Sequence, residues 1–306
     1  MKKLKALTFT LLLSFSLAAC GSENNASTGA SADVNDSSGT ADGTVSKGQE
    51  DTNSDNDAKS NDSQAEDGKD SDYIKEKGTL VVGVTDFEPM DYTDDDGEWI
   101  GFDADVAKAF AKSLGVSAEF IEIDWDNKIM ELDGKTIDCV WNGMTLTDEV
   151  TNSMECSNAY CNNAQVVVLP GKIADKYQDV DSLSDLTFAV ETGSAGEEQA
   201  EAHSLNYTSV KDQASALMEV ASGTSDAAII DSLMADAMVG EGTGYADLTH
   251  TVALNNEEYG VGFRKGSDLA AELNTFFDNS YADGSILETA EKYGVQAALI
   301  KKESQD

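Results

Sequence analysis

Short apolar runs alternate with amphipathic stretches along the chain after residue 71. The run 78–84 has the length of a buried strand. Asp103 is expected to cap a helix over residues 104–114, which places its apolar side chains on one face and stops at Gly115. Similar apolar runs recur near 163–169, 187–190 and 226–230. Strands that alternate with helices favour largely parallel sheets with helices on their faces, so we expect an α/β fold.

The first twenty residues follow a different pattern. Lys2, Lys3 and Lys5 form a positive start to the chain. The apolar stretch 4–17 is too short to span a bilayer comfortably and is followed by Ala-Ala-Cys20. This ending resembles the bacterial lipobox, in which a lipid is attached to the cysteine and the chain is cut just before it. We therefore expect residues 1–20 to be a lipoprotein signal peptide, with the mature chain held on the extracytoplasmic face of the cell membrane through lipidated Cys20. An ordinary secretory signal with a chance cysteine is the alternative.

Residues 21–71 are too polar to form a core. The segment holds 12 acidic residues and 3 lysines, and its only apolar residues besides alanine are Val34 and Val45. So little apolar surface cannot offset the entropy that is lost on ordering. We expect a disordered acidic linker that acts as a passive spacer, with a partner-binding acidic tail as the alternative.

Charge and composition exclude several classes of protein. Acidic residues outnumber basic ones 58 to 20 among the 306 residues, which gives a net charge of −38. Nucleic-acid binding needs a cationic face, so this class is disfavoured. The two histidines and four cysteines are too dispersed for a metal centre, and nothing in the sequence calls for a cofactor.

Six short motifs occur in a fixed order after the linker, and together they carry a resemblance. They are Leu80-Val-Val-Gly83, Gly101-Phe-Asp-Ala-Asp105, the run DCVWNGMTLT at 138–147, Ser157-Asn-Ala-Tyr160, Glu191-Thr-Gly-Ser194 and Ala227-Ala-Ile-Ile-Asp231. In this order and at these separations they resemble the polar amino-acid-binding proteins of ABC importers. The resemblance covers nearly everything from Tyr73 to about Gly294 and rests on the ordered set, since no single motif is specific.

The resemblance implies the two-lobed type II periplasmic-binding-protein fold, in which the ligand lies between lobes joined by two hinge strands. Lobe 1 would comprise residues 72–163 and 255–306, and lobe 2 residues 164–254, each a mostly parallel sheet flanked by helices. The hinge strands would fall near 163–168 and 254–260. The implied function is delivery of an amino acid or related amine-bearing solute to ABC permease subunits, by a monomer that is not an enzyme.

Asp231 is the residue that the resemblance implies for the ligand's ammonium group. It closes an apolar strand and opens a helix, and in α/β sheets ligands bind beyond the carboxyl ends of strands. A carboxylate at the start of a helix is also a common N-cap, which is the alternative role for Asp231.

Two turns are the next candidates for contacts with the ligand. Gly193-Ser194-Ala195 lies between a strand and a helix, where backbone N–H groups form an anion site, and the resemblance assigns the ligand carboxylate to it. Asn142-Gly143-Met144-Thr145 is the matching turn in lobe 1, where glycine allows close approach and the Thr145 hydroxyl can donate. Plain turns, with Ser194 as a helix cap, are the alternatives.

Three aromatic residues are assigned by their positions. Phe87 and Trp125 match places where the resembled family sandwiches the aliphatic part of the ligand between bulky side chains, and flat rings offer large contact areas. Core packing is the alternative for both. Trp141 lies between Val140 and Asn142, and we expect it in the core.

One departure from the family pattern concerns the ligand's carboxylate. The resembled family has an arginine after Thr147-Asp148-Glu149, whereas this chain has Val150, and its single arginine, Arg264, is expected outside the cleft. Glu191 adds a carboxylate near the second-lobe turn, although its side chain could point away. We therefore hypothesise a cleft that favours cationic or neutral amine-bearing ligands, unless a lysine replaces the arginine.

The three cysteines in the expected folded part leave two interpretations open. Cys156 and Cys161 are close enough in sequence to bridge across a turn, or all three thiols, with Cys139, are free and buried.

Two other functions are compatible with the same sequence features. One is a lipoprotein that presents its ligand to a receptor without transport, and the other is a small-molecule dehydratase on the same fold. The missing arginine weighs against the dehydratase, because an anionic substrate calls for a cationic group.

Overall fold

The computed structural model describes residues 69–300. All of these residues belong to one compact unit of the chain. The expected signal peptide, the expected lipidation site at Cys20 and nearly all of the expected linker lie outside the described residues. Among residues 69–300 no helix has the length and apolar character needed to cross a membrane.

The first lobe is built on a six-stranded sheet. Its strands run in the order β4-β1-β5-β13-β6, and β7 also pairs with β13. Their bounds are β1 Thr79–Val84, β4 Ser117–Glu122, β5 Cys139–Thr145, β6 Glu155–Cys156, β7 Cys161–Asn163 and β13 Glu257–Phe263. A small hairpin joins β2 Tyr92–Thr93 to β3 Trp99–Ile100.

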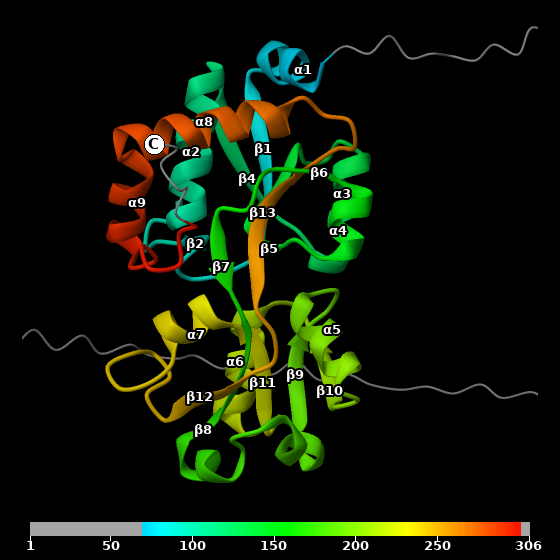
Figure 1. Ribbon diagram of the computed structural model, residues 1–306, viewed down its shortest axis with the longest axis vertical. Helices are drawn as coiled ribbons and strands as arrows, with labels where there is room; N and C mark the ends of the chain where they lie inside the picture. The colour runs from blue at the N-terminus through cyan, green and yellow to red at the C-terminus, as the bar shows by residue number, and fades with distance from the viewer. Residues whose placement is uncertain (1–68, 301–306) are drawn as a thin grey trace, which may run out of the picture. The chain divides into compact units, whose positions relative to one another are not determined.

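Helices cover both faces of this first sheet (Figure 1). On one side lie α2 Phe102–Leu114, α8 Leu269–Asp283 and α9 Ser285–Tyr293, and on the other α3 Lys128–Asp133 and α4 Asp148–Ser153. The short 3-10 turn Trp125–Asn127 precedes α3. Trp141 packs edge-on against Phe277 with ring centroids 6.0 Å apart and is 1% exposed, so the expectation that it belongs to the core is confirmed.

The second lobe is built on a five-stranded sheet in the order β10-β9-β11-β8-β12. The strands are β8 Gln165–Pro170, β9 Thr187–Glu191, β10 Asn206–Val210, β11 Ala227–Asp231 and β12 Leu248–Ala253. Its helices are α5 Ala195–Ala202, α6 Gln213–Ser222 and α7 Ser232–Met238, with 3-10 turns at Gly171–Lys176 and Val180–Asp185.

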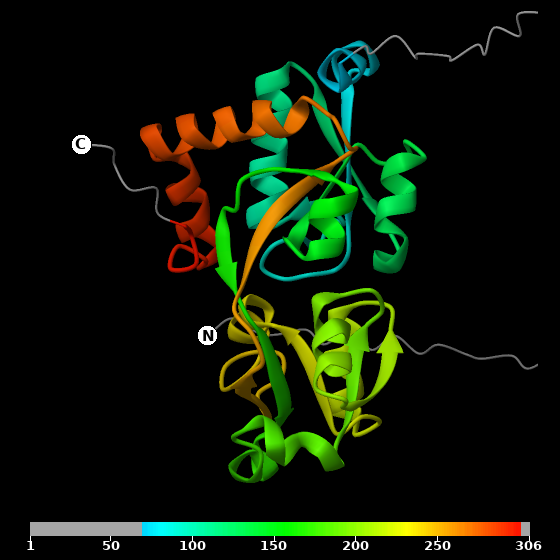
Figure 2. The same ribbon diagram turned by 45° about the vertical axis from the view of Figure 1, so that its right-hand side comes forward.

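Two crossings join the lobes, and both are visible in Figure 2. The chain leaves the first sheet after Asn163 and enters the second at Gln165, and it returns between Ala253 and Glu257. The crossing strands β8 and β13 run antiparallel to their neighbours, while β1 with β4 and β5, and β9 with β10 and β11, are parallel. Each sheet is therefore mixed: all its strands share one direction, as expected for a mostly parallel sheet, except the crossing strand, which is reversed.

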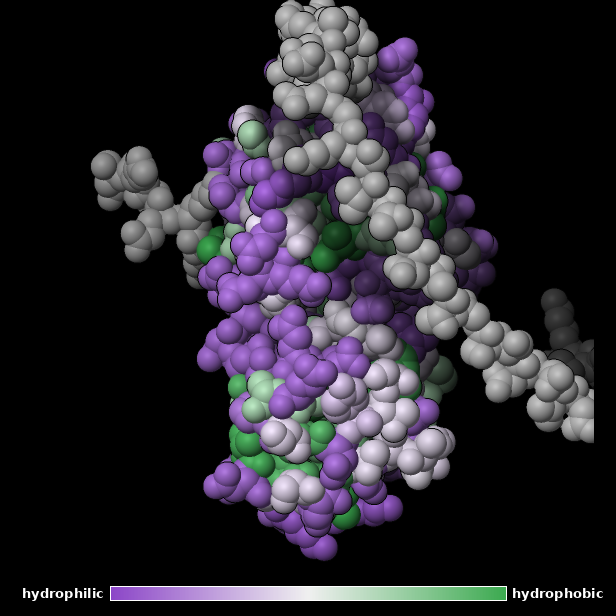
Figure 3. Space-filling view, turned by 90° about the vertical axis from the view of Figure 1, so that its right-hand side faces the viewer, coloured by the Kyte–Doolittle hydropathy of each residue, from purple (hydrophilic) through white to green (hydrophobic). Residues whose placement is uncertain are grey.

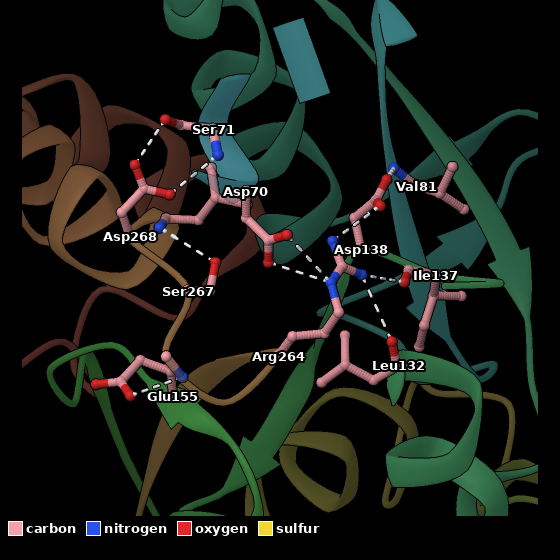
Figure 4. A network of polar contacts seen from close by, with 12 residues as sticks. Asp70, Ser71, Val81, Leu132, Ile137, Asp138, Glu155, Arg264, Ser267 and Asp268 are labelled. Atoms are coloured by element: carbon pink, nitrogen blue, oxygen red, sulfur yellow. Dashed lines mark hydrogen bonds and ion pairs between the residues drawn. The ribbon is translucent and has the colours of Figure 1, made fainter. Parts of the chain in front are cut away.

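The single arginine lies in the first lobe, away from the space between the lobes. Its guanidinium donates to the carbonyl of Ile137 at 2.9 Å and forms ion pairs with Asp70 and Asp138 (Figure 4). These partners fix α1 Asp70–Lys77 onto the lobe, together with Ser71, which donates to Asp268. The helix includes Asp70 and Ser71, which we expected in the linker, because folded partners distant in sequence stabilise these two polar residues.

The cysteines are free in the described part of the chain: Cys139, Cys156 and Cys161 form no disulfide. Cys156 pairs opposite Gly262 of β13, while Cys161 pairs opposite Tyr259. Three residues of a strand span about 10 Å, which exceeds the limit of about 7 Å between the Cα atoms of a disulfide. The bridge between Cys156 and Cys161 considered from the sequence is therefore absent from this structure.

Hydrophilic residues predominate on the face seen in Figure 3, and apolar residues show there in small separate groups. This distribution agrees with the acidic excess of the sequence. The large apolar side chains are instead found in the clusters that line the two sheets, with Phe110, Phe188 and Phe263 fully buried.

Candidate functional site

A pocket between the two lobes contains all ten residues selected from the sequence. They are Phe87, Trp125, Asn142, Gly143, Met144, Thr145, Gly193, Ser194, Ala195 and Asp231. The wall also includes Lys128, Val150, Glu191 and Gln213, with Glu149 and Glu198 at exposed positions. Residues from both sheets therefore meet at one place, as expected for a ligand held between lobes.

Asp231 lies at the carboxyl end of β11 and is 3% exposed. Its Oδ1 accepts hydrogen bonds from Tyr259 Oη at 2.6 Å, from Gln165 Nε2 at 3.1 Å and from Asn163 Nδ2. Its Oδ2 accepts from Gln213 Nε2. Asp231 occupies the N-cap position of α7, as the alternative interpretation expected, but its side chain makes no capping hydrogen bond to the helix.

The surroundings of Asp231 disfavour its ionised form. Burial, and next the nearby Glu257 carboxylate, raise its pKa to about 8. Neutral donors from Gln213 and Tyr259 oppose this rise, but none of its four hydrogen-bond partners carries a positive charge. A cation that enters the pocket would therefore gain a buried carboxylate that the protein itself leaves without a counter-ion.

The second-lobe turn is shaped by hydrogen bonds within the turn and to the helix that follows. The Ser194 hydroxyl accepts from the backbone N–H of Glu197 at 3.2 Å, which confirms Ser194 as the cap of α5. The Glu197 carboxylate in turn accepts from the backbone N–H of Gly193 at 2.7 Å. Glu197 thus takes one of the N–H groups that we expected to meet an anion.

Residues 142–145, which we expected to form a turn in the first lobe, are instead the second half of β5, because antiparallel pairing with β13 continues through Thr145. Side chains of the first lobe use most of the polar groups of this segment. The Asn142 amide bonds to Thr85 and, at 2.9 Å, to the Asp91 carboxylate, while the N–H of Gly143 donates to Asp103 Oδ2 at 2.7 Å. The Thr145 hydroxyl donates to Glu257 at 2.9 Å, so toward the pocket it can only accept. This arrangement suits a ligand that donates hydrogen bonds, such as an ammonium group.

Two buried carboxylates lie behind this part of β5. Asp103 sits inside α2 rather than capping it, and accepts from the Tyr160 hydroxyl at 2.6 Å. Burial raises the pKa of Asp103 to about 7, and it raises the pKa of Asp91 well above its usual range. These acids support the strand that carries Asn142 and Gly143, and they do not line the pocket.

The aromatic walls lie where the sequence placed them. Phe87 is 2% exposed and meets Tyr259 edge-on at 6.4 Å, and Trp125 is 8% exposed. Gly143 has a φ of +55°, and a Cβ there would lie 2.6 Å from Phe87 Cε1, so the ring occupies space that only glycine leaves. Phe87 and Trp125 both pack in the core and line the pocket, so the two interpretations from the sequence are compatible.

Lys128 is a pocket residue that the sequence analysis did not select. It opens α3 and is 5% exposed, and its amine donates to the carbonyl of Gly193 in the other lobe at 2.9 Å. Burial lowers the pKa of Lys128, while Glu149 and Glu191 oppose this effect. Lys128 is the one cation among the described residues that line the pocket. No local pattern in the sequence distinguishes Lys128 from a lysine on a solvated helix face.

The lobes touch one another around the pocket. Besides Lys128 and Gly193, an ion pair between Glu122 and Lys211 crosses from the first lobe to the second. The space inside measures about 440 Å³ with the open mouth included. Because these contacts join the two lobes beside the pocket, separation of the lobes would break them and widen the entrance for a ligand.

No group of three or more histidine, cysteine or acidic side chains with the geometry to hold a metal occurs among residues 69–300. The described residues that line the pocket offer carboxylates, one amine, amides, hydroxyls and aromatic rings. Such a set can hold a small polar molecule by hydrogen bonds and charge.

Two α/β lobes, two crossing segments and a polar pocket between them define a solute-binding protein of the kind that serves ABC importers. The chain matches the family described as bacterial extracellular solute-binding proteins, family 3, over residues 80–296. The protein belongs to this family. An extracytoplasmic location agrees with this membership.

Individual relatives agree with this assignment. The L-cystine-binding protein TcyJ of Escherichia coli is 29% identical over 225 residues, which cover 72% of this chain and 84% of TcyJ. The arginine-binding extracellular protein ArtP of Bacillus subtilis is 30% identical over 227 residues, which cover 71% and 86% of the two chains. Both are named as binding proteins.

A solved structure extends the likeness to three dimensions. The crystal structure of the ancestral amino acid-binding protein AncCDT-1, a precursor of cyclohexadienyl dehydratase, is similar with a TM-score of 0.67 and 31% identity. The match covers 73% of this chain and 99% of that one. The fold is therefore that of a type II periplasmic-binding protein.

Proposed function

We propose that this protein binds an amino acid or a closely related amine-bearing solute and delivers it to ABC permease subunits. The observation that carries the proposal is the pairing of a buried acid and a buried amine across one pocket. Asp231 receives the ligand's ammonium group, and Thr145 accepts a further hydrogen bond from it. Lys128 pairs with the ligand's carboxylate. Val150, which stands where the resembled family has an arginine, has no charge to offer this group.

The relatives support the chemical class. TcyJ and ArtP are named for L-cystine and arginine, which both carry an α-ammonium and a carboxylate. The protein acts as a monomer that is tethered through lipidated Cys20, and it does no chemistry on its ligand. Because AncCDT-1 is a precursor of a dehydratase, the binding test includes analysis of the recovered ligand by mass spectrometry.

Isothermal titration calorimetry of the folded part against the twenty amino acids and cystine tests this function. We expect at least one of them to bind and to be recovered unchanged, and the matching amine that lacks the carboxylate to bind much more weakly. Failure of every amino acid to bind would reject the proposal. Turnover of a bound ligand would favour the enzyme instead.

Binding of an ammonium group is expected to tighten as the pH rises from 6 to 8. Asp231 and Glu191 both have pKa values of about 8 in this structure. A bound cation favours their ionised forms, so their pKa values fall and protons are released on binding. Each released proton strengthens binding by up to about tenfold per pH unit below the pKa of the free protein.

Calorimetry at both pH values, in buffers of different ionisation enthalpy, counts these protons. Asp212, Glu257 and Lys128 also face the two acids, and the measured number includes any response from them. Binding that weakens with rising pH, or that takes up protons, would contradict the assignment of Asp231 to the ammonium group.

A further inference from the structure

Glu191 is a buried acid in the pocket that the protein leaves without a partner at one oxygen. It is the last residue of β9, it is 2% exposed, and it lines the pocket. Its Oε1 has no hydrogen-bond partner. Burying a carboxylate oxygen without a hydrogen bond costs free energy of folding. A ligand that donates a hydrogen bond to this oxygen would offset that cost.

The one cation among the described residues of the pocket wall, Lys128, interacts with Glu191 electrostatically but does not form an ion pair with it. Glu191 forms no salt bridge among the described residues, and the nearby charged groups that act most strongly on it are two further acids, Asp231 and Asp212. Lys128 lies in the same pocket, but its amine donates to the carbonyls of Trp125 and Gly193. Burial and the two acids raise the pKa of Glu191 to about 8.

The positions of Glu191 and Asp231 follow from the sheet. Strands β9 and β11 are parallel neighbours, with Phe188 opposite Ala227 and Ala189 opposite Ala228. Continued to the strand ends, this register places the two acids one residue apart on adjacent strands, with Cα atoms about 6 Å from each other. The pocket therefore presents two separate buried carboxylates at neighbouring strand ends.

We propose that Glu191 is a second cation subsite, so that the solute is an amino acid whose side chain ends in a positive charge. This inference rests on the proposed function, in which Asp231 takes the α-ammonium group and Lys128 the carboxylate. The charged end of the side chain donates to Glu191 Oε1. The aliphatic part lies between Phe87 and Trp125.

The balance of charge agrees with this ligand. The pocket wall holds Asp231, Glu191, Glu149 and Glu198 against the single Lys128. A neutral zwitterion satisfies one acid and the lysine, and it leaves Glu191 unpaired. A ligand with one additional positive charge also pairs Glu191, and desolvated pairs of opposite charge discriminate strongly between ligands.

Pairs of ligands matched in shape test the subsite. Arginine with citrulline, and lysine with norleucine, are titrated against the native protein, Glu191→Gln and Glu201→Gln. Glu201 lies in α5 outside the pocket and is exposed, so its variant loses the same charge from the same lobe. Circular dichroism of each variant checks that it is folded.

We expect the native protein and Glu201→Gln to prefer the cationic member of at least one pair by about 30-fold or more. Glu191→Gln should lose most of this preference while it still binds the neutral member. If the native protein binds neutral and cationic members equally, or if Glu191→Gln keeps the preference, the subsite is wrong and the proposed function stands. If no amino acid binds, both are wrong.

Discussion

Replacement of Asp231 by asparagine is expected to weaken ligand binding roughly 10²- to 10³-fold. The change removes the negative charge that meets the ligand's ammonium group in a desolvated site. Breaking a buried ion pair by removing one partner costs about 3–5 kcal/mol, and each 1.4 kcal/mol corresponds to about a tenfold change in affinity. The side chain is 3% exposed, so solvent cannot replace the lost charge.

Asp236→Asn is the matched control for this experiment. Asp236 lies in α7, and its side chain is 66% exposed in a contact with His250. It does not line the pocket, so its variant should bind like the native protein. Titration calorimetry measures both affinities, and thermal unfolding checks that both variants are folded. Native affinity in Asp231→Asn would show that the ammonium site has been placed wrongly.

The fold could be predicted from the sequence because the patterns that indicate its strands and helices are local and recur along the chain. Apolar strand runs, helix faces and stops such as Gly115 recur along the chain, and their order matched a known family. The direction of the crossing strands could not be read in this way. Strands β8 and β13 have ordinary apolar patterns, and only their pairing partners make them antiparallel.

The pocket residues could be selected from motif positions, whereas their partners could not. The sequence identified Asp231, but its bonds to Tyr259 and Gln213 come from residues 28 and 18 positions away. Local reasoning assigned Asp103 to a helix cap, yet its carboxylate bonds to Gly143 and Tyr160. Local sequence rules can predict helix caps. The hydrogen-bond partners of a buried acid come from residues that are distant in sequence, so these rules do not predict them.

The positive charge of the pocket, Lys128, could not be predicted from the sequence either. We expected a pocket without its usual guanidinium and left open whether a lysine replaces it. A lysine in a short helix has no pattern that distinguishes a pocket from a solvated face. The amine reaches the carbonyl of Gly193 across the space between the lobes, which is a contact between residues 65 positions apart.

Replacement of Gly193 by alanine is expected to weaken binding roughly 10- to 100-fold by preventing full approach of the lobes. Gly193 has a φ of +70°, and a Cβ there would lie 2.8 Å from the Cα of Asp126 in the other lobe. Overpacking of a close contact costs about 1–3 kcal/mol, and this cost falls on the closed form that holds the ligand.

Gly223→Ala separates this effect from backbone strain. Gly223 ends α6 with a φ of +77°, and no atom lies within 4 Å of a Cβ built there. Both variants therefore bear the strain of a left-handed alanine, about 1–2 kcal/mol, and should lose similar stability in denaturant unfolding. Only Gly193→Ala should lose affinity in calorimetry, because only its methyl group stands between the lobes. Equal affinities for the two variants would mean that ligand binding does not require the contact between Gly193 and Asp126.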